Sequence, residues 1–522
     1  MSLRSAAIVA LLISVVPALS IGATAKPAMV PASPQAKSTD GIAWYEGDVD
    51  AAFAFAKAHD KPLFLYWGAT WCPPCNQVKA TIFNRQDFID RTSFFVPVHI
   101  DGDAPEAQKL GDRFKVRAYP TMILFKSDGK EITRLPGEVD ADRYLKTLTL
   151  GLNANHPVKE TMAAALAGKK LSADEWRLLA FYSWETDEQQ LAGSSELLPT
   201  LQKLAKAAPA GDAAKRLALS VMVAAANQKP EPVSFDKAAA NNTLTEVLAN
   251  PHTAKDNMDL LVNYPAELVG LLAPANSATH AKLILAFDKA MRLLDADRSM
   301  SKTDRLSALA AQVSLARIDT PQGALPAALL KQVMARVAET ERATTDVYER
   351  QSVINTAGHI LSDAGLLTES DTLLKAELQR SHSPYYFMLS LASNAKKRGD
   401  KDAAISWYEQ AYQASKGPAT RLQWGAAYLN GLIELAPQDE TRIGSVARSV
   451  FEQVGRTPGA FYERNRSVLE RVSTKLTEWN KSGQHETVLR SVRAQLDDVC
   501  RKLPATDVQK VTCQGLLKPA KV

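Results

Sequence analysis

Apolar and polar positions follow two different patterns along the 522 residues of this chain. In the first pattern, short continuous apolar runs alternate with stretches in which apolar residues recur at helical spacing. The runs predict buried strands at residues 63–67, 94–100 and 122–125. The stretches between and around them predict helices at residues 49–59, 76–82, 106–114 and 141–150. This alternation predicts an α/β domain at residues 41–152.

The second pattern begins after Asn153, where the strand signals end. Apolar residues then recur at helical spacing, interrupted by Pro, Gly, Asn and Asp. Ser172 and Glu175 form the sequence signature of a capping box at one such helix start. We therefore expect residues 160–522 to be an all-α region, either an α-solenoid or a set of helical hairpins.

One internal repeat is measurable in this region. Gly365 and Pro384 recur as Gly399 and Pro418, 34 residues later. With small and bulky apolar residues at matching offsets, residues 350–418 resemble tetratricopeptide repeats. A generic helical bundle is the alternative. The aromatic residues here are interpreted as core packing rather than a binding patch: Tyr385, Tyr386, Phe387, Trp407 and Trp424.

Length and charge narrow the classes of function. The chain is too long for a single core, so several domains or an extended array are expected. The net charge of +5 is mild and is not concentrated in a basic stripe, so nucleic acid is not indicated as a partner.

The N-terminus has the three-part order of a secretory signal. Arg4 precedes an apolar core at residues 6–19, and Ala23-Thr24-Ala25 offers a cleavage site after Ala25. Residues 26–40 are expected to be a loose linker. Cleavage predicts a periplasmic or secreted protein. The later sequence has no uncharged apolar stretch of 18 residues, so we expect no membrane span after the signal. An uncleaved anchor at residues 5–25 is the alternative.

The strongest chemical signal is the run Trp71-Cys72-Pro73-Pro74-Cys75, which lies between a predicted strand and a predicted helix. This position puts Cys72 at a helix N-terminus, where the helix dipole and free N–H groups favour the thiolate. Cys75, three residues later, is close enough to form a disulfide with Cys72. The pair therefore predicts thiol–disulfide exchange. Half of a zinc site is the alternative, but only His59 and His99 are nearby as further ligands.

Together with this run, the later Tyr119-Pro120-Thr121 makes residues 41–150 resemble a thioredoxin domain. Residues 81–94 make it most similar to the C-terminal domain of the periplasmic disulfide interchange protein DsbD and its relatives. The resemblance implies a cis peptide bond before Pro120, beside the redox pair. It also implies that Gly137 follows the last strand.

The same resemblance gives roles to the residues of the site. Cys72 is expected to be the attacking thiolate and Cys75 the resolving thiol. Trp71 is expected to shield the pair, and Tyr119 to present its backbone to a substrate chain. Pro73 and Pro74 remove backbone donors and stiffen the turn. The chemistry uses the protein's own sulfurs, so we expect no cofactor and no metal.

The chain departs from thioredoxin at one functional pair. The position of thioredoxin's buried acid holds Tyr66, and the position of its lysine partner holds Pro97. That pair transfers a proton to and from the second cysteine during exchange. Another group or water must do so here.

The other two cysteines, Cys500 and Cys513, flank residues 503–507, where one predicted helix ends and another begins. We expect them to form a structural disulfide, although a second redox pair is the alternative. The whole sequence predicts an exported thiol–disulfide oxidoreductase that acts on protein thiols and disulfides. It is expected to be a reductant supplied by an upstream redox partner in the envelope, with a helical region for partner binding. The alternative is an envelope scaffold whose thioredoxin domain is a docking module.

Overall fold

The computed structural model describes residues 41–137, 140–187, 190–227 and 236–518. These residues lie in one compact unit, Gln35–Val522. The predicted signal sequence, its cleavage site and the linker at residues 26–40 lie outside the described residues.

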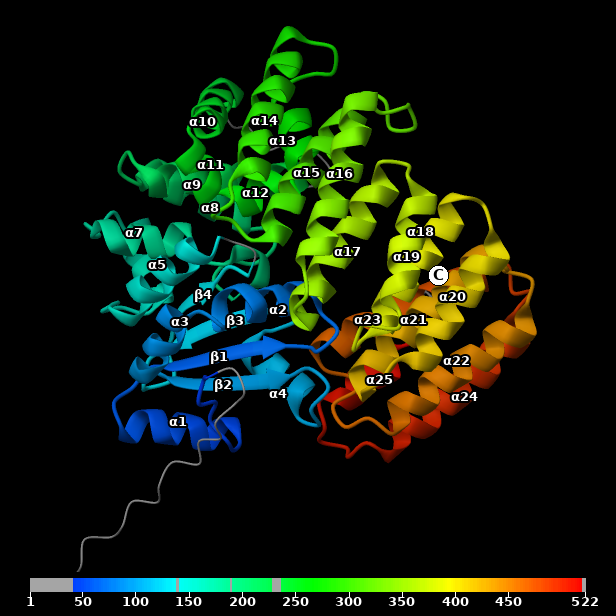
Figure 1. Ribbon diagram of the computed structural model, residues 1–522. Helices are drawn as coiled ribbons and strands as arrows, with labels where there is room; N and C mark the ends of the chain where they lie inside the picture. The colour runs from blue at the N-terminus through cyan, green and yellow to red at the C-terminus, as the bar shows by residue number, and fades with distance from the viewer. Residues whose placement is uncertain (1–40, 138–139, 188–189, 228–235, 519–522) are drawn as a thin grey trace, which may run out of the picture. The chain divides into compact units, whose positions relative to one another are not determined.

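The first part of the described chain is built on a four-stranded mixed sheet with the order β2-β1-β3-β4 (Figure 1). β1 pairs in parallel with β2 and antiparallel with β3, and β3 pairs antiparallel with β4. The strands are β1 (Leu63–Gly68), β2 (Val96–Asp101), β3 (Thr121–Phe125) and β4 (Glu131–Leu135). The surrounding helices are α1 (Val49–Ala58), α2 (Pro73–Val78), the π-helix η1 (Lys79–Phe83), α3 (Gln86–Arg91), the 3₁₀ turn η2 (Thr92–Phe94), α4 (Ala107–Phe114) and α5 (Ala141–Leu152).

Side chains of β1 alternate between two apolar cores, as the period of a strand requires. Phe64 and Tyr66 belong to the core that also contains the two redox cysteines, whereas Leu65 and Trp67 belong to the core on the other face. Every residue of β1 is buried, which explains why its sequence is a continuous apolar run. The predicted α/β order is confirmed. The predicted helix at residues 76–82 is in fact α2 followed by the π-helix η1.

The rest of the described chain is mostly helical, as predicted. Its helices are α6 (Val158–Leu166), α7 (Ala173–Ala180), the 3₁₀ turn η3 (Trp184–Thr186), α8 (Leu197–Ala207), α9 (Asp212–Asn227), α10 (Lys237–Ala249), α11 (Pro251–Asp256), α12 (Met258–Asn263), α13 (Pro265–Leu272), α14 (Ala278–Ala296), α15 (Lys302–Arg317), α16 (Ala327–Ala343), α17 (Val347–Asp363), α18 (Leu367–Glu377), α19 (Pro384–Lys397), α20 (Lys401–Ala414), α21 (Pro418–Leu435), α22 (Glu440–Gly455), α23 (Glu463–Trp479), α24 (Glu486–Lys502) and α25 (Gln509–Gly515).

The 34-residue spacing corresponds to a repeated helical pair between α17 and α21. Gly365 and Gly399 both follow a helix and adopt positive φ angles of 85° and 79°. This left-handed conformation favours glycine and ends a helix tightly. Pro384 and Pro418 are the first residues of α19 and α21. The same turn residues therefore occupy equivalent places in successive helical pairs.

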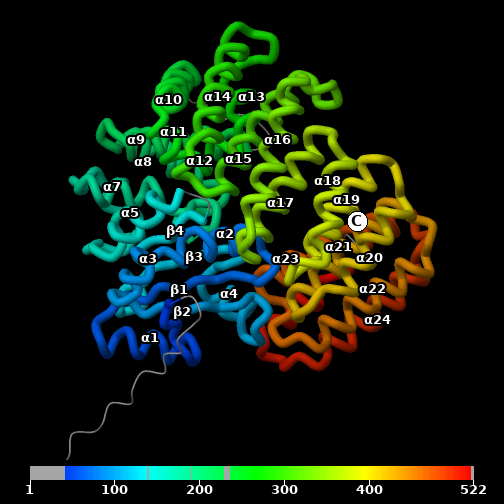
Figure 2. Tube along the Cα trace, viewed as in Figure 1, coloured from blue at the N-terminus to red at the C-terminus, as the bar shows by residue number. Residues whose placement is uncertain are grey.

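The helical region contacts the end of the sheet that carries the redox cysteines. α17 packs against α2 and η1, and α23 packs against α4 (Figure 2). α5 ends at Leu152 and α6 begins at Val158, close to the predicted domain boundary. No described helix combines the length and apolar character needed to cross a bilayer.

Candidate active site

The redox cysteines lie in the turn that joins β1 to α2. Cys72 is the N-cap of α2, and its Sγ accepts a 3.2 Å hydrogen bond from the backbone N–H of Cys75. Pro73 and Pro74 occupy the first helical positions, where no partner for a backbone N–H is needed. The two cysteines form a disulfide with a Cα–Cα distance of 5.2 Å. Local sequence therefore places Cys72 at the helix start, as expected.

The second expected element of the site is also in place. The Tyr119-Pro120 peptide bond is cis. A Cβ added to Gly137 would lie 3.1 Å from Cγ of Pro120, so glycine allows the segment after β4 to approach this proline closely. The Tyr119 hydroxyl accepts a 3.1 Å hydrogen bond from Nε2 of Gln108. Tyr119 and Trp71 are in contact, with ring centroids 6.2 Å apart.

The helical region covers this site. Only 2% of Cys72 and 0% of Cys75 is exposed to solvent. The indole Nε1–H of Trp71 donates a 2.7 Å hydrogen bond to Oγ1 of Thr420 in α21. The Trp71 ring also stacks on Tyr386 and meets Trp424 edge-on, with centroids 5.8 and 4.9 Å away. We call Tyr386, Thr420, Trp424 and Arg464 the cover.

Arg464 is the charged residue of the cover. Its guanidinium lies 4.9 Å from the centroid of Tyr119 and 5.7 Å from that of Trp71, within the range of cation–π attraction. It also donates a 2.9 Å hydrogen bond to the backbone oxygen of Arg117. Burial lowers the pKa of Arg464 below its usual range. The cover therefore binds both the tryptophan before Cys72 and the tyrosine before Pro120.

Polar contacts hold the cover at its edges. The Asp103 carboxylate accepts hydrogen bonds from the backbone N–H and the hydroxyl of Thr420. Burial raises the pKa of Asp103, although these two hydrogen bonds oppose the shift. Glu463, which is 6% exposed, accepts a 2.8 Å hydrogen bond from Nε of Arg117. His382 Nε2 lies 2.9 Å from the backbone oxygen of Thr70.

Sequence reasoning missed the cover. The sequence predicts core packing for Tyr386 and Trp424, and both are largely buried, but they pack against the redox loop as well as against neighbouring helices. No local signal marks Thr420 or Arg464. Their contacts join residues more than 300 positions apart, and a single sequence carries no record of such pairing.

Tyr66 occupies the position where thioredoxin has a proton-transferring acid, and the structure explains what it does instead. The side chain is buried, and its hydroxyl has no hydrogen-bond partner among the described residues. Burial, followed by the negative charge of Asp101, raises the pKa of Tyr66. The ring stacks on His99 at 4.8 Å. Tyr66 is thus a packing residue, and it does not replace the carboxylate as a base near neutral pH.

Cys500 and Cys513 are also joined by a disulfide. Cys500 lies in the last turn of α24 and Cys513 in α25, and both are buried. The bond therefore connects two helices across the turn that the sequence indicated. Neither cysteine has the helix N-cap position of Cys72.

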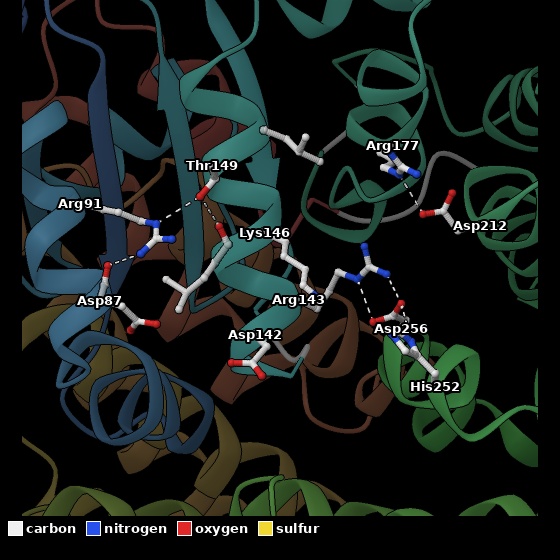
Figure 3. Close-up of a pocket in the computed structure, with 12 residues that line it drawn as sticks. Asp87, Arg91, Asp142, Arg143, Lys146, Thr149, Arg177, Asp212, His252 and Asp256 are labelled. Atoms are coloured by element: carbon white, nitrogen blue, oxygen red, sulfur yellow. Dashed lines mark hydrogen bonds and ion pairs between the residues drawn. The ribbon is translucent and has the colours of Figure 1, made fainter.

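A separate hollow of about 660 Å³ lies between α3, α5 and the following helices. Figure 3 shows that its arginines face oxygen acceptors. Arg143 bonds to Asp256, Arg177 bonds to Asp212 at 2.9 Å, and Arg91 bonds to Thr149 at 3.1 Å. Two of these contacts are ion pairs, Arg143 with Asp256 and Arg177 with Asp212, and the first joins α5 to α11 of the helical region.

Comparison with known proteins agrees with the geometry of the redox loop. Residues 49–151 match the family of thioredoxin-like domains. Thioredoxin Y2 of Arabidopsis thaliana chloroplasts is 32% identical over 89 residues, covering 17% of this chain and 50% of that protein. The thiol:disulfide interchange protein DsbD of Yersinia pestis is 31% identical over 98 residues, covering 18% of this chain and 16% of DsbD. The predicted thioredoxin-like domain is confirmed.

A solved structure from Bacteroides thetaiotaomicron, described as that of a proposed disulphide isomerase, is 32% identical. The match covers 23% of this chain and 99% of that one, with a TM-score of 0.21. The chain spans half the length of the chloroplast thioredoxin and less than a fifth of DsbD. The match to the family model ends at residue 151 and does not extend into the helical region.

Proposed function

We propose that this protein is a thiol–disulfide oxidoreductase that acts through Cys72 and Cys75. The observation that carries the proposal is the Cys72–Cys75 disulfide at the start of α2, in a domain that matches the family of thioredoxin-like domains. The matches to proteins named thioredoxin and thiol:disulfide interchange protein support this chemistry.

In the reducing direction, the Cys72 thiolate attacks one sulfur of a substrate disulfide. A bond forms between Cys72 and that sulfur, the substrate S–S bond breaks, and the first substrate thiolate leaves. The Cys75 thiolate then attacks Cys72 Sγ, which forms the intramolecular disulfide and releases the second substrate thiolate. Two electrons pass to the substrate, both substrate thiolates take up protons, and a dithiol partner must reduce the protein again.

We propose the role of reductant because of the resemblance to the DsbD domain, which is 31% identical over 98 residues. We also propose that the signal sequence at residues 1–25 is cleaved and that the protein works in the periplasm or outside the cell. Four cysteines in two disulfides suit such an oxidising compartment.

The helical region is proposed to bind protein partners. The repeated glycine and proline positions between α17 and α21 support a tetratricopeptide-like array, a fold that presents extended binding surfaces. Part of this array is already used by the chain itself, since α21 supplies the Thr420 that bonds to Trp71.

The burial of Cys72 favours a second candidate function. An incoming sulfur cannot reach a thiolate that is only 2% exposed unless the cover moves. If the cover never moves, the protein is a scaffold in which the thioredoxin-like domain is a docking module and its disulfide is structural.

A variant with Cys72→Ser and Cys75→Ser separates the two functions. The oxidoreductase proposal expects complete loss of insulin disulfide reduction, with an unchanged circular dichroism spectrum. The matched control, Cys500→Ser with Cys513→Ser, should retain reduction. Full cellular function of the Cys72/Cys75 double variant would support the scaffold instead.

A further inference from the structure

Asn76, the residue after Cys75, holds the turn that contains the redox pair. Its side chain lies in α2 and is 0% exposed. The amide Nδ2 donates two 2.9 Å hydrogen bonds, one to the backbone oxygen of Thr70 and one to that of Cys72. One side chain therefore connects the first turn of α2 to the backbone on both sides of Trp71.

The oxygen of this amide makes no such bond. Asn76 Oδ1 is buried and has no hydrogen-bond partner among the described residues. A buried acceptor without a donor costs free energy, and an apolar side chain of the same shape, such as leucine, avoids this cost. Packing alone therefore does not explain an asparagine at this position, and its specific contribution is the pair of hydrogen bonds that Nδ2 donates.

Both backbone oxygens have a further partner. The Cys72 oxygen accepts a 3.0 Å hydrogen bond from the backbone N–H of Asn76, which belongs to the helical ladder of α2. The Thr70 oxygen lies 2.9 Å from Nε2 of His382. Because loss of the Asn76 amide leaves neither oxygen without a partner, we expect a small effect on the stability of the oxidised protein.

The restraint has its largest effect when the disulfide is open. In the oxidised protein, the S–S bond itself joins Cys72 to Cys75. In the dithiol form that bond is absent, and the backbone of the turn must keep the Cys72 sulfur beside the Cys75 N–H. Such N–H groups at a helix N-terminus stabilise a thiolate. A side chain that holds this backbone therefore stabilises the reduced state more than the oxidised state.

We infer that Asn76 is a positioning residue for the Cys72 thiolate. It acts through the backbone of Thr70 and Cys72 rather than through the sulfur. The inference rests on the proposed function, because it adds a residue to the same redox site.

Two substitutions remove both side-chain donors. Asn76→Leu keeps the size of the side chain, and Asn76→Ala serves where leucine does not fit. Each should raise the pKa of Cys72, measured from the ultraviolet absorbance of the thiolate. Each should also lower the equilibrium constant for reduction of Cys72–Cys75 by glutathione about tenfold, equivalent to about 30 mV. Unchanged values in both variants would overturn the inference.

A third variant and a control test the hydrogen bonds themselves. In Asn76→Ser, the hydroxyl donates to the carbonyl four residues earlier, that of Cys72, so one donor replaces two and the shifts should be smaller than in Asn76→Leu. Asn84→Ala is the matched control, because Asn84 is exposed and its Nδ2 donates to the backbone oxygen of Ala80. It should leave both values unchanged. Shifts in Asn76→Ser as large as those in Asn76→Leu would contradict a role for the bond to Cys72.

Unfolding measurements separate positioning from a purely structural role. Asn76→Leu and Asn76→Ala should lower the free energy of unfolding of the reduced protein more than that of the oxidised protein. Equal losses in the two states, or failure of both variants to fold, would make Asn76 a structural residue and overturn the inference.

The same measurements distinguish this inference from the proposed function. If the wild type reduces no insulin but Asn76→Leu still raises the pKa of Cys72, the positioning role stands and the oxidoreductase proposal fails. If the wild type reduces insulin and neither variant changes the pKa or the equilibrium constant, the proposed function stands and the positioning role fails.

Discussion

The indole Nε1–H of Trp71 donates a 2.7 Å hydrogen bond to Oγ1 of Thr420, which lies 349 residues later in the chain. This bond joins the residue before Cys72 to helix α21 of the helical region. The Cys72 sulfur is buried in the structure in which this contact is made, so we expect access to Cys72 to depend on the position of α21.

Loss of this bond should open the cover. Thr420→Val leaves the buried Trp71 indole and the Asp103 carboxylate without their hydroxyl partner, at a cost of about 1–3 kcal/mol to the covered state. A loss of about 1.4 kcal/mol would raise the alkylation rate of Cys72 in the reduced protein about tenfold. Iodoacetamide labelling measures the rate. Thr368→Val, at an exposed position of α18, is the control. Equal labelling of wild type and Thr420→Val would show that the cover does not limit access.

Cys72 should react before Cys75. Cys72 is the N-cap of α2 and accepts a hydrogen bond from the Cys75 N–H, which stabilises its thiolate, whereas Cys75 lies within the helix and is 0% exposed. Alkylation of the reduced protein below neutral pH, followed by peptide mass spectrometry, should find the label on Cys72 first. Cys75→Ala should accumulate mixed disulfides with substrates, because the resolving thiol is gone. Preferential labelling of Cys75 would reverse the two roles.

The Cys500–Cys513 disulfide should resist mild reductant while Cys72–Cys75 opens. Both of its cysteines are buried between α24 and α25, and neither is at a helix N-cap. Replacing both with serine should lower the free energy of unfolding by roughly 3 kcal/mol in the chain-entropy model. Graded reduction with mass spectrometry of the trapped thiols measures the order. Reduction of both pairs at one potential would remove the support for a structural role.

Acid should stabilise the covered state through Asp103. Burial raises the pKa of this carboxyl, so the folded protein binds the proton more tightly than the unfolded chain does. The charged form therefore costs stability at neutral pH, and this cost disappears as the pH falls through the raised pKa towards the usual pKa of aspartate. The difference in unfolding free energy between wild type and Asp103→Asn should shift in favour of the wild type over that range. A difference that does not change with pH would show that Asp103 is not desolvated.

The thioredoxin-like domain should fold without the helical region. A fragment of residues 26–155 ends in the Asn-containing segment after α5, residues 153–155, and includes the complete sheet. It should reduce insulin, and it should do so faster than the full chain because Trp71 is no longer covered. A folded but inert fragment, with an active full chain, would mean that the helices complete the active site. The thioredoxin-like domain would then not be an independent functional unit.

The sequence alone predicted those parts of the fold and of the site that neighbouring residues determine. Neighbouring residues determine the apolar run of β1 and the turn Cys72-Pro73-Pro74-Cys75 that follows it. The cis bond before Pro120 was predicted from a family resemblance that rests on several matching motifs. The change from α-helix to π-helix at η1 was not predictable, because η1 is only five residues long and so short a segment does not establish a separate apolar period in the sequence.

Contacts between residues far apart in the chain could not be predicted from the sequence. The burial of Trp424 follows from helical spacing, but its partner Trp71 does not, since apolar periodicity identifies a buried face and not what covers it. A cavity lies beside Pro120, and it also results from contacts between residues far apart in the sequence. Its lining joins residue 120 to Arg216 and Asp259, which only the packing of α9 and α12 brings together.

A redox titration of the full chain tests whether Cys72 and Cys75 form a redox-active pair. The protein is equilibrated in thiol–disulfide buffers of graded potential, and the alkylated cysteines are identified by mass spectrometry. We expect one two-electron transition at Cys72 and Cys75 between roughly −270 and −120 mV, the range of thioredoxin-fold oxidoreductases. A Cys72–Cys75 disulfide that stays closed down to about −300 mV, as structural disulfides do, would contradict it.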